Sequence, residues 1–177
     1  MGHIQSAYCR IGDQAVQIAK PLLQTIGTVH LIESGTAITD KLQQSGVDVM
    51  TFTSQEKLFC IEIKGSQKTY DKIHIETVQD TRTGSKGWIY HIESDFLFWI
   101  YIDTKIGYML RVGPLKDWFD LHEWLYERVE HKKNSGACSL GILVKWEDIY
   151  IELGAENFFK FNLNTNWDRG MKSLGLN

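Results

Sequence analysis

The sequence is poor in the features that mark several common classes of protein. It has three cysteines among 177 residues, Cys9, Cys60 and Cys138, with no Cys-x-x-Cys pair. This odd number and wide spacing indicate neither a disulfide framework nor a zinc site. The longest apolar run, residues 96–102, is too short to cross a bilayer, and the chain does not open on a charged-then-apolar segment. We therefore expect an intracellular, cytoplasmic protein without a membrane partner.

The chain also lacks an excess of basic residues. Lys and Arg number 19 against 22 Asp and Glu, and the formal net charge is -3. Affinity for nucleic-acid phosphates usually comes from a surplus of Lys and Arg, so a large nucleic-acid surface is disfavoured. A site built from carboxylates lowers the formal charge until its metal binds, and basic residues can still cluster on one face. The charge balance therefore leaves a compact acidic site compatible with a nucleic-acid partner.

Hydrophobic residues make up 43% of the chain and aromatic residues 12%, which is enough for one core. We find no internal repeat and no low-complexity linker. The sequence predicts a single α/β domain over residues 1–177, with a core over about 13–130 and a C-terminal extension over 131–177. Apolar spacing predicts helices over 13–25 and 115–129. The predicted strands cover residues 28–33, 47–52, 58–64, 72–78, 88–90, 95–103, 106–112 and 140–146.

The segment from Gly46 to Lys64 is predicted to form a β-hairpin. Two apolar runs flank a polar stretch of five residues, 53–57, which suits a hairpin loop. If Phe52 faces Leu58, then Asp48 faces Glu62. Directly opposed like charges destabilise an antiparallel pair, so a positive charge is expected between these two carboxylates. A slip of one residue would place Asp48 on the other face of the hairpin.

Two readings of these charges are open. Carboxylate oxygens of Asp48 and Glu62 are ligands for Mg²⁺ or Mn²⁺, and Lys64 lies on the same face as Glu62. A metal lowers the pKa of a bound water, while the lysine orients that water and stabilises charge on a phosphate. Alternatively, Glu62 and Lys64 form an exposed surface pair that contributes little. From chemistry alone, the two readings are about equally supported.

The order of motifs resembles that of a known family. Asp48 between two valines is followed by Phe59–Lys64, Ile75-Glu76, Gly87-Trp88-Ile89 and residues 94–99. This order is similar to the core of the PD-(D/E)XK nuclease superfamily, and especially to small phage-type and Holliday-junction-resolvase-like members. The resemblance covers roughly residues 13–130, and the acid-x-Lys triplet is its most specific part. The proline of the family's name is replaced by Val47.

The resemblance implies a restriction-endonuclease-like core, in which helices flank a four-stranded mixed sheet. Asp48, Glu62 and the backbone carbonyl of Ile63 would be metal ligands, and Lys64 the catalytic lysine. The implied activity is Mg²⁺-dependent (or Mn²⁺-dependent) DNA cleavage, often by a homodimer. Glu76 stands where phage-like relatives carry an acidic residue, and Asp13 is a candidate for the acidic residue on the first helix. Each has an ordinary alternative, a solvated strand carboxylate for Glu76 and a helix cap for Asp13.

Basic residues after the hairpin are candidates for DNA contacts. Lys68 follows the site along the chain, and Arg82 and Lys86 bracket Gly84 in a loop that could approach a phosphate closely. A solvated loop explains these residues equally well. Three functions therefore remain open: a metal-dependent DNA endonuclease acting on duplex or branched DNA, a Holliday-junction resolvase acting as a dimer, and a catalytically inactive nuclease-like module that binds nucleic acid or protein.

Overall fold

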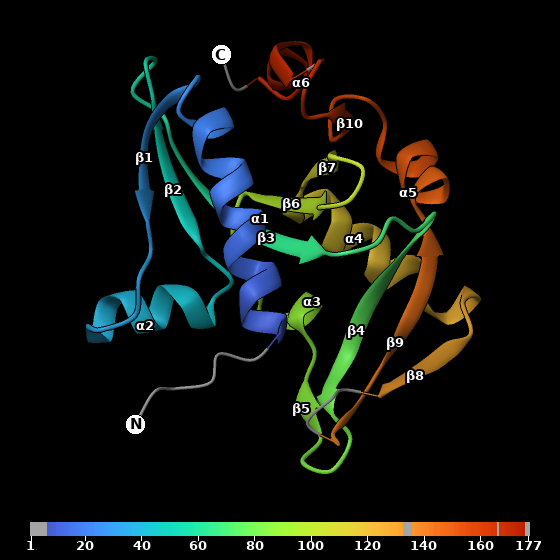
Figure 1. Ribbon diagram of the computed structural model, residues 1–177. Helices are drawn as coiled ribbons and strands as arrows, with labels where there is room; N and C mark the ends of the chain where they lie inside the picture. The colour runs from blue at the N-terminus through green and yellow to red at the C-terminus, as the bar shows by residue number, and fades with distance from the viewer. Residues whose placement is uncertain (1–6, 133–135, 166, 176–177) are drawn as a thin grey trace.

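The computed structural model describes residues 7–132, 136–165 and 167–175, which form two β-sheets with helices packed against them (Figure 1). The larger sheet has six strands and is mixed, because β3 pairs with β6 in parallel while its other neighbouring strands are antiparallel. In spatial order its strands are β1 (Gly27–Leu31), β2 (Val49–Thr53), β3 (Leu58–Ser66), β6 (Phe96–Tyr101), β7 (Ile106–Arg111) and β10 (Phe158–Asn162). The predicted α/β class, with a mixed central sheet flanked by helices, is confirmed.

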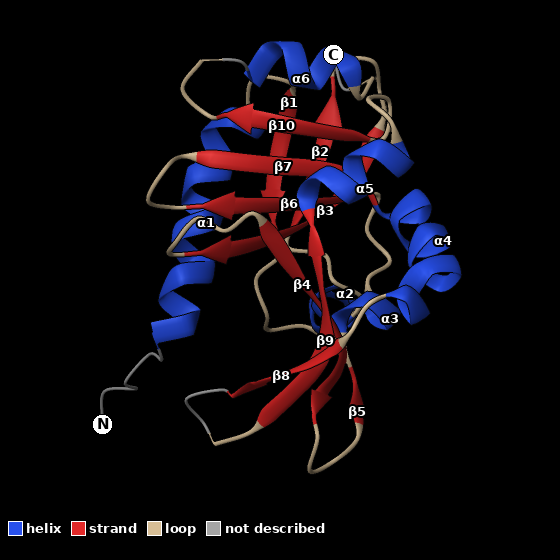
Figure 2. Ribbon diagram, turned by 90° about the vertical axis from the view of Figure 1, so that its right-hand side faces the viewer, coloured by secondary structure: helices blue, strands red, loops and turns tan. Residues whose placement is uncertain are grey.

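A second, antiparallel sheet stands apart from the first (Figure 2). In spatial order it contains β5 (Ser85–Lys86), β4 (Lys72–Asp80), β9 (Cys138–Lys145) and β8 (Arg128–Lys132). The family resemblance implied a central mixed sheet of four strands. The structure corrects this expectation, because the central sheet has six strands and β4 belongs to the second sheet. Ile73 and Ile75 pair with Val144 and Ile142 on β9, and all four side chains are fully buried. This shared apolar face draws β4 to β9.

The helices cover both faces of the larger sheet (Figure 2). Their bounds are α1 (Ala7–Leu23), α2 (Ala37–Gln44), α3 (Trp88–His91), α4 (Val112–His122), the 3₁₀ turn η1 (Glu123–Leu125), α5 (Trp146–Leu153) and α6 (Trp167–Ser173). Helix α1 buries Ala15, Ala19 and Leu23, four residues apart, against the sheet. A Cβ on Gly65 of β3 would lie 2.9 Å from the Cβ of Ala15. Small residues on both elements thus let α1 pack closely on β3.

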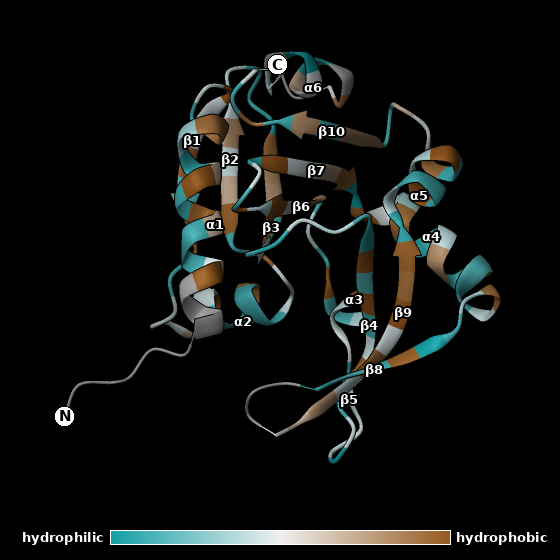
Figure 3. Ribbon diagram, turned by 45° about the vertical axis from the view of Figure 1, so that its right-hand side comes forward, coloured by the Kyte–Doolittle hydropathy of each residue, from teal (hydrophilic) through white to brown (hydrophobic). Residues whose placement is uncertain are grey.

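Two hydrophobic clusters hold these layers together. One lies under α1 and α6 and includes Ile61 and Phe98 of the larger sheet. The other includes Leu97 of β6 together with residues of β4, β9, α4 and α5, and in it the rings of Tyr108 and Trp146 stack with centroids 4.2 Å apart. Figure 3 shows β9 mostly in the hydrophobic colour and α2 mostly in the hydrophilic colour, and α2 buries no residue. Helix α2 is therefore a surface element, with its side chains open to a ligand.

Several predicted elements differ from the structure. Residues 88–90, predicted as a strand, form helix α3. The predicted helix over 115–129 ends at His122, and Val129 lies in β8. The strand predicted over 140–146 is β9, and β10 follows it. Residues after 131 thus supply strands to both sheets. In the described part of the chain, no helix is long and apolar enough to span a membrane.

Candidate active site

The β2–β3 hairpin has the predicted register. Met50 pairs with Cys60 and Phe52 pairs with Leu58. Asp48 directly precedes β2, and its N–H donates to the carbonyl of Ile61 over 3.0 Å. This bond is one position off the register, because Val49 also pairs with Ile61, so Asp48 does not continue the ladder to a direct pairing with Glu62. The predicted register is therefore present from Val49 to Phe52, and Asp48 lies just beyond it.

The carboxyl groups of Asp48 and Glu62 converge. Burial, followed by the negative charge of Glu62, raises the pKa of Asp48 from 3.8 to about 6, and a hydrogen bond between the two side chains acts in the same direction. Two contacts oppose the rise: Asp48 Oδ2 accepts the N–H of Ile63 over 2.8 Å, and Lys64 adds a nearby positive charge. Because like charges in a partly buried place repel, a cation is the group that would allow both carboxylates to stay ionised.

Lys64 completes the charged group. Its Nζ lies 2.5 Å from Glu62 Oε1, and their side chains are 25% and 13% exposed. The ion pair is therefore shielded from much of the solvent screening that weakens surface pairs. The Nζ also lies over the indole of Trp88, 5.6 Å from the ring centroid. Lys64 is thus held between a carboxylate and an aromatic face.

The donor set fits a hard, hydrated cation. In the described residues there is no group of three or more His, Cys, Asp and Glu side chains that could hold a metal ion. Mg²⁺ does not need such a cage, since it usually keeps several waters and takes one or two carboxylates from the protein. Asp48 and Glu62 would supply these two carboxylates, and the carbonyl of Ile63, the residue between Glu62 and Lys64, is the further oxygen that we predict. A site of zinc type, with four protein ligands, does not fit.

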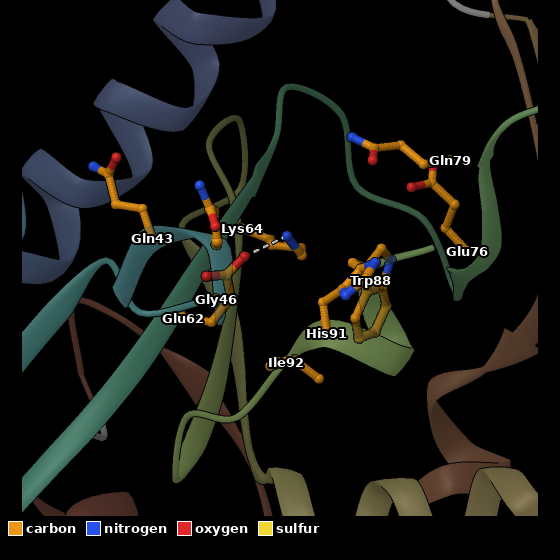
Figure 4. Close-up of a pocket in the computed structure, with 10 residues that line it drawn as sticks. Gln43, Gly46, Glu62, Lys64, Glu76, Gln79, Trp88, His91 and Ile92 are labelled. Atoms are coloured by element: carbon orange, nitrogen blue, oxygen red, sulfur yellow. Dashed lines mark hydrogen bonds and ion pairs between the residues drawn. The ribbon is translucent and has the colours of Figure 1, made fainter. Parts of the chain in front are cut away.

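A cavity of about 550 Å³ opens beside this group. Glu62 and Lys64 line one part of it, and Glu76, Trp88 and His91 line another. Figure 4 shows Trp88 and His91 between the Glu62–Lys64 pair and Glu76. The cavity therefore joins residues of the larger sheet to residues of β4 in the second sheet. It gives a ligand direct access to Glu62 and Lys64.

Glu76 reaches this cavity but lies on its far side from Glu62 (Figure 4). Asp13 is exposed on α1 and lines a different cavity, together with Gln14, Gln17 and Lys105. The structure therefore brings Asp48, Glu62 and Lys64 together, places Glu76 across the cavity from them, and leaves Asp13 elsewhere.

The predicted DNA-contacting residues lie outside the cavity lining. Lys68 is exposed beyond β3. Arg82 makes a double hydrogen bond to Asp80, through Nε at 3.0 Å and Nη2 at 2.7 Å. The Nζ of Lys86 lies over the ring of Tyr90, 5.9 Å from its centroid. Lys68 lies near the end of β3, and Arg82 and Lys86 lie on the β4–β5 side of the molecule. All three are exposed, and these positions are compatible with contacts to phosphates.

Several residues that line the cavity were not predicted from sequence as site residues: Gly46, Trp88, Gln43, Gln44, Gln79 and Ile92. Gly46 has a φ of +69°, and a Cβ there would lie 3.3 Å from both Glu62 Oε2 and the Cα of Ile92. A glycine directly after a polar helix is the signal that indicates this tight turn. Trp88 was predicted to lie in a strand, so its contact with Lys64 could not be foreseen. Its position depends on Gly87, whose N–H donates to Thr77 O over 2.9 Å and whose Cβ would collide with Glu76 O.

Comparisons with known proteins add one fold likeness. No protein-family model matches the chain, and no curated protein matches it in sequence. Among solved structures, it is similar to the bacterial homing endonuclease I-Ssp6803I, with a TM-score of 0.45 and 17% sequence identity over 63% of this chain and 74% of that chain. A likeness at this level concerns the fold alone and carries no information on the site or the activity.

Proposed function

We propose that this protein is a metal-dependent DNA endonuclease that hydrolyses phosphodiester bonds. The observation that carries the proposal is the convergence of Asp48 and Glu62, with Lys64 Nζ 2.5 Å from Glu62, at the edge of an open cavity. Two carboxylates and an amine in this arrangement match the needs of phosphodiester hydrolysis. The choice of DNA follows from the resemblance of the motif order to PD-(D/E)XK nucleases.

In the proposed reaction, Asp48 and Glu62 would hold the cation, with the Ile63 carbonyl as a further donor. When bound, Mg²⁺ or Mn²⁺ lowers the pKa of a coordinated water and draws negative charge from the phosphate. The amine of Lys64 orients the attacking water and stabilises charge on the phosphate oxygens. The water oxygen bonds to phosphorus, the bond from phosphorus to the leaving oxygen breaks, and that oxygen takes a proton from solvent. The attacking water releases its proton to solvent.

The binding-only alternative would gain if Asp48 and Glu62 did not converge on one cation-sized gap. The two carboxyl groups lie close enough for Glu62 to raise the pKa of Asp48, and this supports the catalytic proposal over an inactive module. The resolvase alternative uses the same residues and adds a dimer that presents two sites at a fixed spacing. Paired nicking of a four-way junction, in preference to linear duplex, would identify it.

The test compares the wild type with Lys64→Ala on linear duplex, single-stranded and four-way-junction DNA, in Mg²⁺, in Mn²⁺ and in EDTA. We expect cleavage by the wild type in either metal, none in EDTA, and a loss of at least roughly a hundredfold in Lys64→Ala. Lys57→Ala is the matched control, because Lys57 is an exposed lysine of the same hairpin. Intact DNA at protein excess would refute the proposal, and equal cleavage by Lys64→Ala would refute the role of Lys64.

A further inference from the structure

The cavity beside the candidate active site has more room and a different chemistry than a phosphate and a metal ion require. Its volume of about 550 Å³ lies in the range of pockets that enclose small organic groups. Besides the charged residues, three glutamines line it: Gln43 and Gln44 from α2, and Gln79 from β4. Trp88 and His91 of α3 add two planar rings. These residues come from α2, α3 and β4, and all of them line the same cavity.

The charges of the lining decide which part of a nucleotide suits it. Glu62 and Glu76 are acidic, whereas Lys64 is the one lysine or arginine among the described residues that line the cavity, and it already pairs with Glu62. Near Glu76 the described lining of the cavity adds a carboxylate and glutamine or aromatic side chains but no further lysine or arginine, which disfavours a phosphate there. A nucleobase is uncharged and avoids this repulsion. The cavity beyond Lys64 therefore favours a base over the sugar-phosphate backbone.

The uncharged groups of the lining are those that recognise bases. A glutamine amide has two donors and an acceptor, and such amides pair with base edges. Gln43 already donates through Nε2 to the carbonyl of Ile32 over 2.7 Å, which leaves its second donor and its oxygen for a base. The indole of Trp88 offers a flat aromatic surface, on which bases stack with little regard to sequence. Lys64 Nζ lies over one face of this indole, so a base would stack on the part of the ring that the amine leaves open and would sit beside the amine that we assign to the reacting phosphate. Base and scissile phosphate could thus belong to one nucleotide or to adjacent ones.

We propose that this cavity binds an unpaired nucleobase next to the scissile phosphate, so that the substrate is single-stranded or locally unpaired DNA. This inference rests on the proposed endonuclease function and names its substrate class. A base inside a duplex is stacked and paired, and it cannot enter such a pocket without leaving the helix. Trp88 is the principal wall of the pocket, and Gln79 contributes to its polar side.

The test measures binding separately from cleavage. Asp48→Asn removes a proposed metal ligand that is not among the residues lining the cavity, so it serves as the background in which DNA stays intact. We would measure the affinity of this variant for three probes of one sequence: a single strand, a perfect duplex, and a duplex with one unpaired base. A 2-aminopurine at the unpaired position reports by fluorescence whether the base is stacked in a pocket. We expect the single strand and the bulged duplex to bind at least roughly tenfold more tightly than the perfect duplex.

In the same background, Trp88→Leu should reduce this preference to near unity, and Trp88→Phe should restore most of it because it keeps an aromatic face. Gln79→Ala, at an exposed position, should weaken the preference without depending on the folding of α3. Trp124→Leu is the matched control, since Trp124 is 76% exposed on η1 and does not line the cavity. Equal binding of all three probes, or an unchanged preference in both Trp88→Leu and Gln79→Ala, would overturn the inference. Binding preference without any cleavage by the wild type would instead contradict the endonuclease function.

Discussion

Replacing Asp48 with asparagine is expected to stabilise the metal-free protein above pH 6. Burial and then the charge of Glu62 raise the pKa of Asp48 to about 6, from 3.8 in its ordinary state. The folded protein therefore holds this proton more tightly than the unfolded chain does. Between about pH 4 and pH 6 the unfolded state binds fewer protons than the folded state, so the free energy of unfolding falls as the pH rises through this window. Above about pH 6 the full destabilisation is present.

The size of the effect follows from the same shift. About two pKa units correspond to about 3 kcal/mol, which is an upper limit for the gain at pH 8. Asparagine keeps an oxygen that can accept the N–H of Ile63, and its amide can donate to Glu62. It still loses hydration on burial, so we expect a gain of about 1–2 kcal/mol. For a chain of this size each kcal/mol corresponds to about 2–4 °C in the unfolding midpoint.

The assay is thermal unfolding followed by circular dichroism, in EDTA and in Mg²⁺, from pH 4.5 to pH 8. In EDTA the difference between Asp48→Asn and the wild type should grow as the pH rises to about 6 and then stay level. In Mg²⁺ the wild type should gain about 2.7 kcal/mol once the metal reaches a hundred times its dissociation constant, while the variant gains little. Asp117→Asn, an exposed position of α4, is the control for removal of one charge. A variant less stable than the wild type in EDTA at pH 8 would refute the electrostatic reasoning.

Two further substitutions test the surroundings of the site and the core. Gly46→Ala places a Cβ 3.3 Å from Glu62 Oε2 at a φ of +69°, so it should cost about 1 kcal/mol of stability and weaken Mg²⁺ binding measured by calorimetry; unchanged metal affinity would show that the turn does not hold Glu62 in place. Phe98→Ala empties a fully buried position beside Phe161 and should cost about 3–5 kcal/mol in denaturant unfolding, whereas Phe52→Ala, at a position 45% exposed, should cost much less. Similar losses in the two phenylalanine variants would contradict this view of the core.

The local parts of the site were accessible from the sequence. The register of the β2–β3 hairpin follows from a short loop between two apolar runs, and it brings Asp48 to Glu62 without any knowledge of the rest of the chain. The hairpin of β6 and β7 was predicted for the same reason and is present. Both depend on contacts between segments that are close in sequence, where turn chemistry and alternation carry the information.

The far side of the cavity was not accessible in this way. Residues 88–90 are too few for the sequence to distinguish a strand from a single helical turn. In the structure Gly87 docks against β4, and the helix begins at the next residue. β4 joins β9 because their buried isoleucines and valine match across more than sixty residues of chain. Pairings of this kind depend on tertiary packing, and propensity gives little guidance on them. Trp88 therefore reached the cavity by contacts that no local pattern encodes, whereas Glu76 was a candidate only through the family resemblance.

The two halves of the cavity also differ in what stabilises them. Glu62 and Lys64 sit on β3, where they pair in parallel with Leu97 and Trp99 of β6, whereas the ladder from β3 to β2 ends at Ile61. Trp88, in contrast, lies on a helix of four residues whose single fully covered side chain is Ile89. Short elements with few buried groups open at a lower free energy than central strands. Trp88, on this short helix, can therefore adjust to an entering nucleotide more readily than Glu62 and Lys64, which belong to a strand inside the larger sheet.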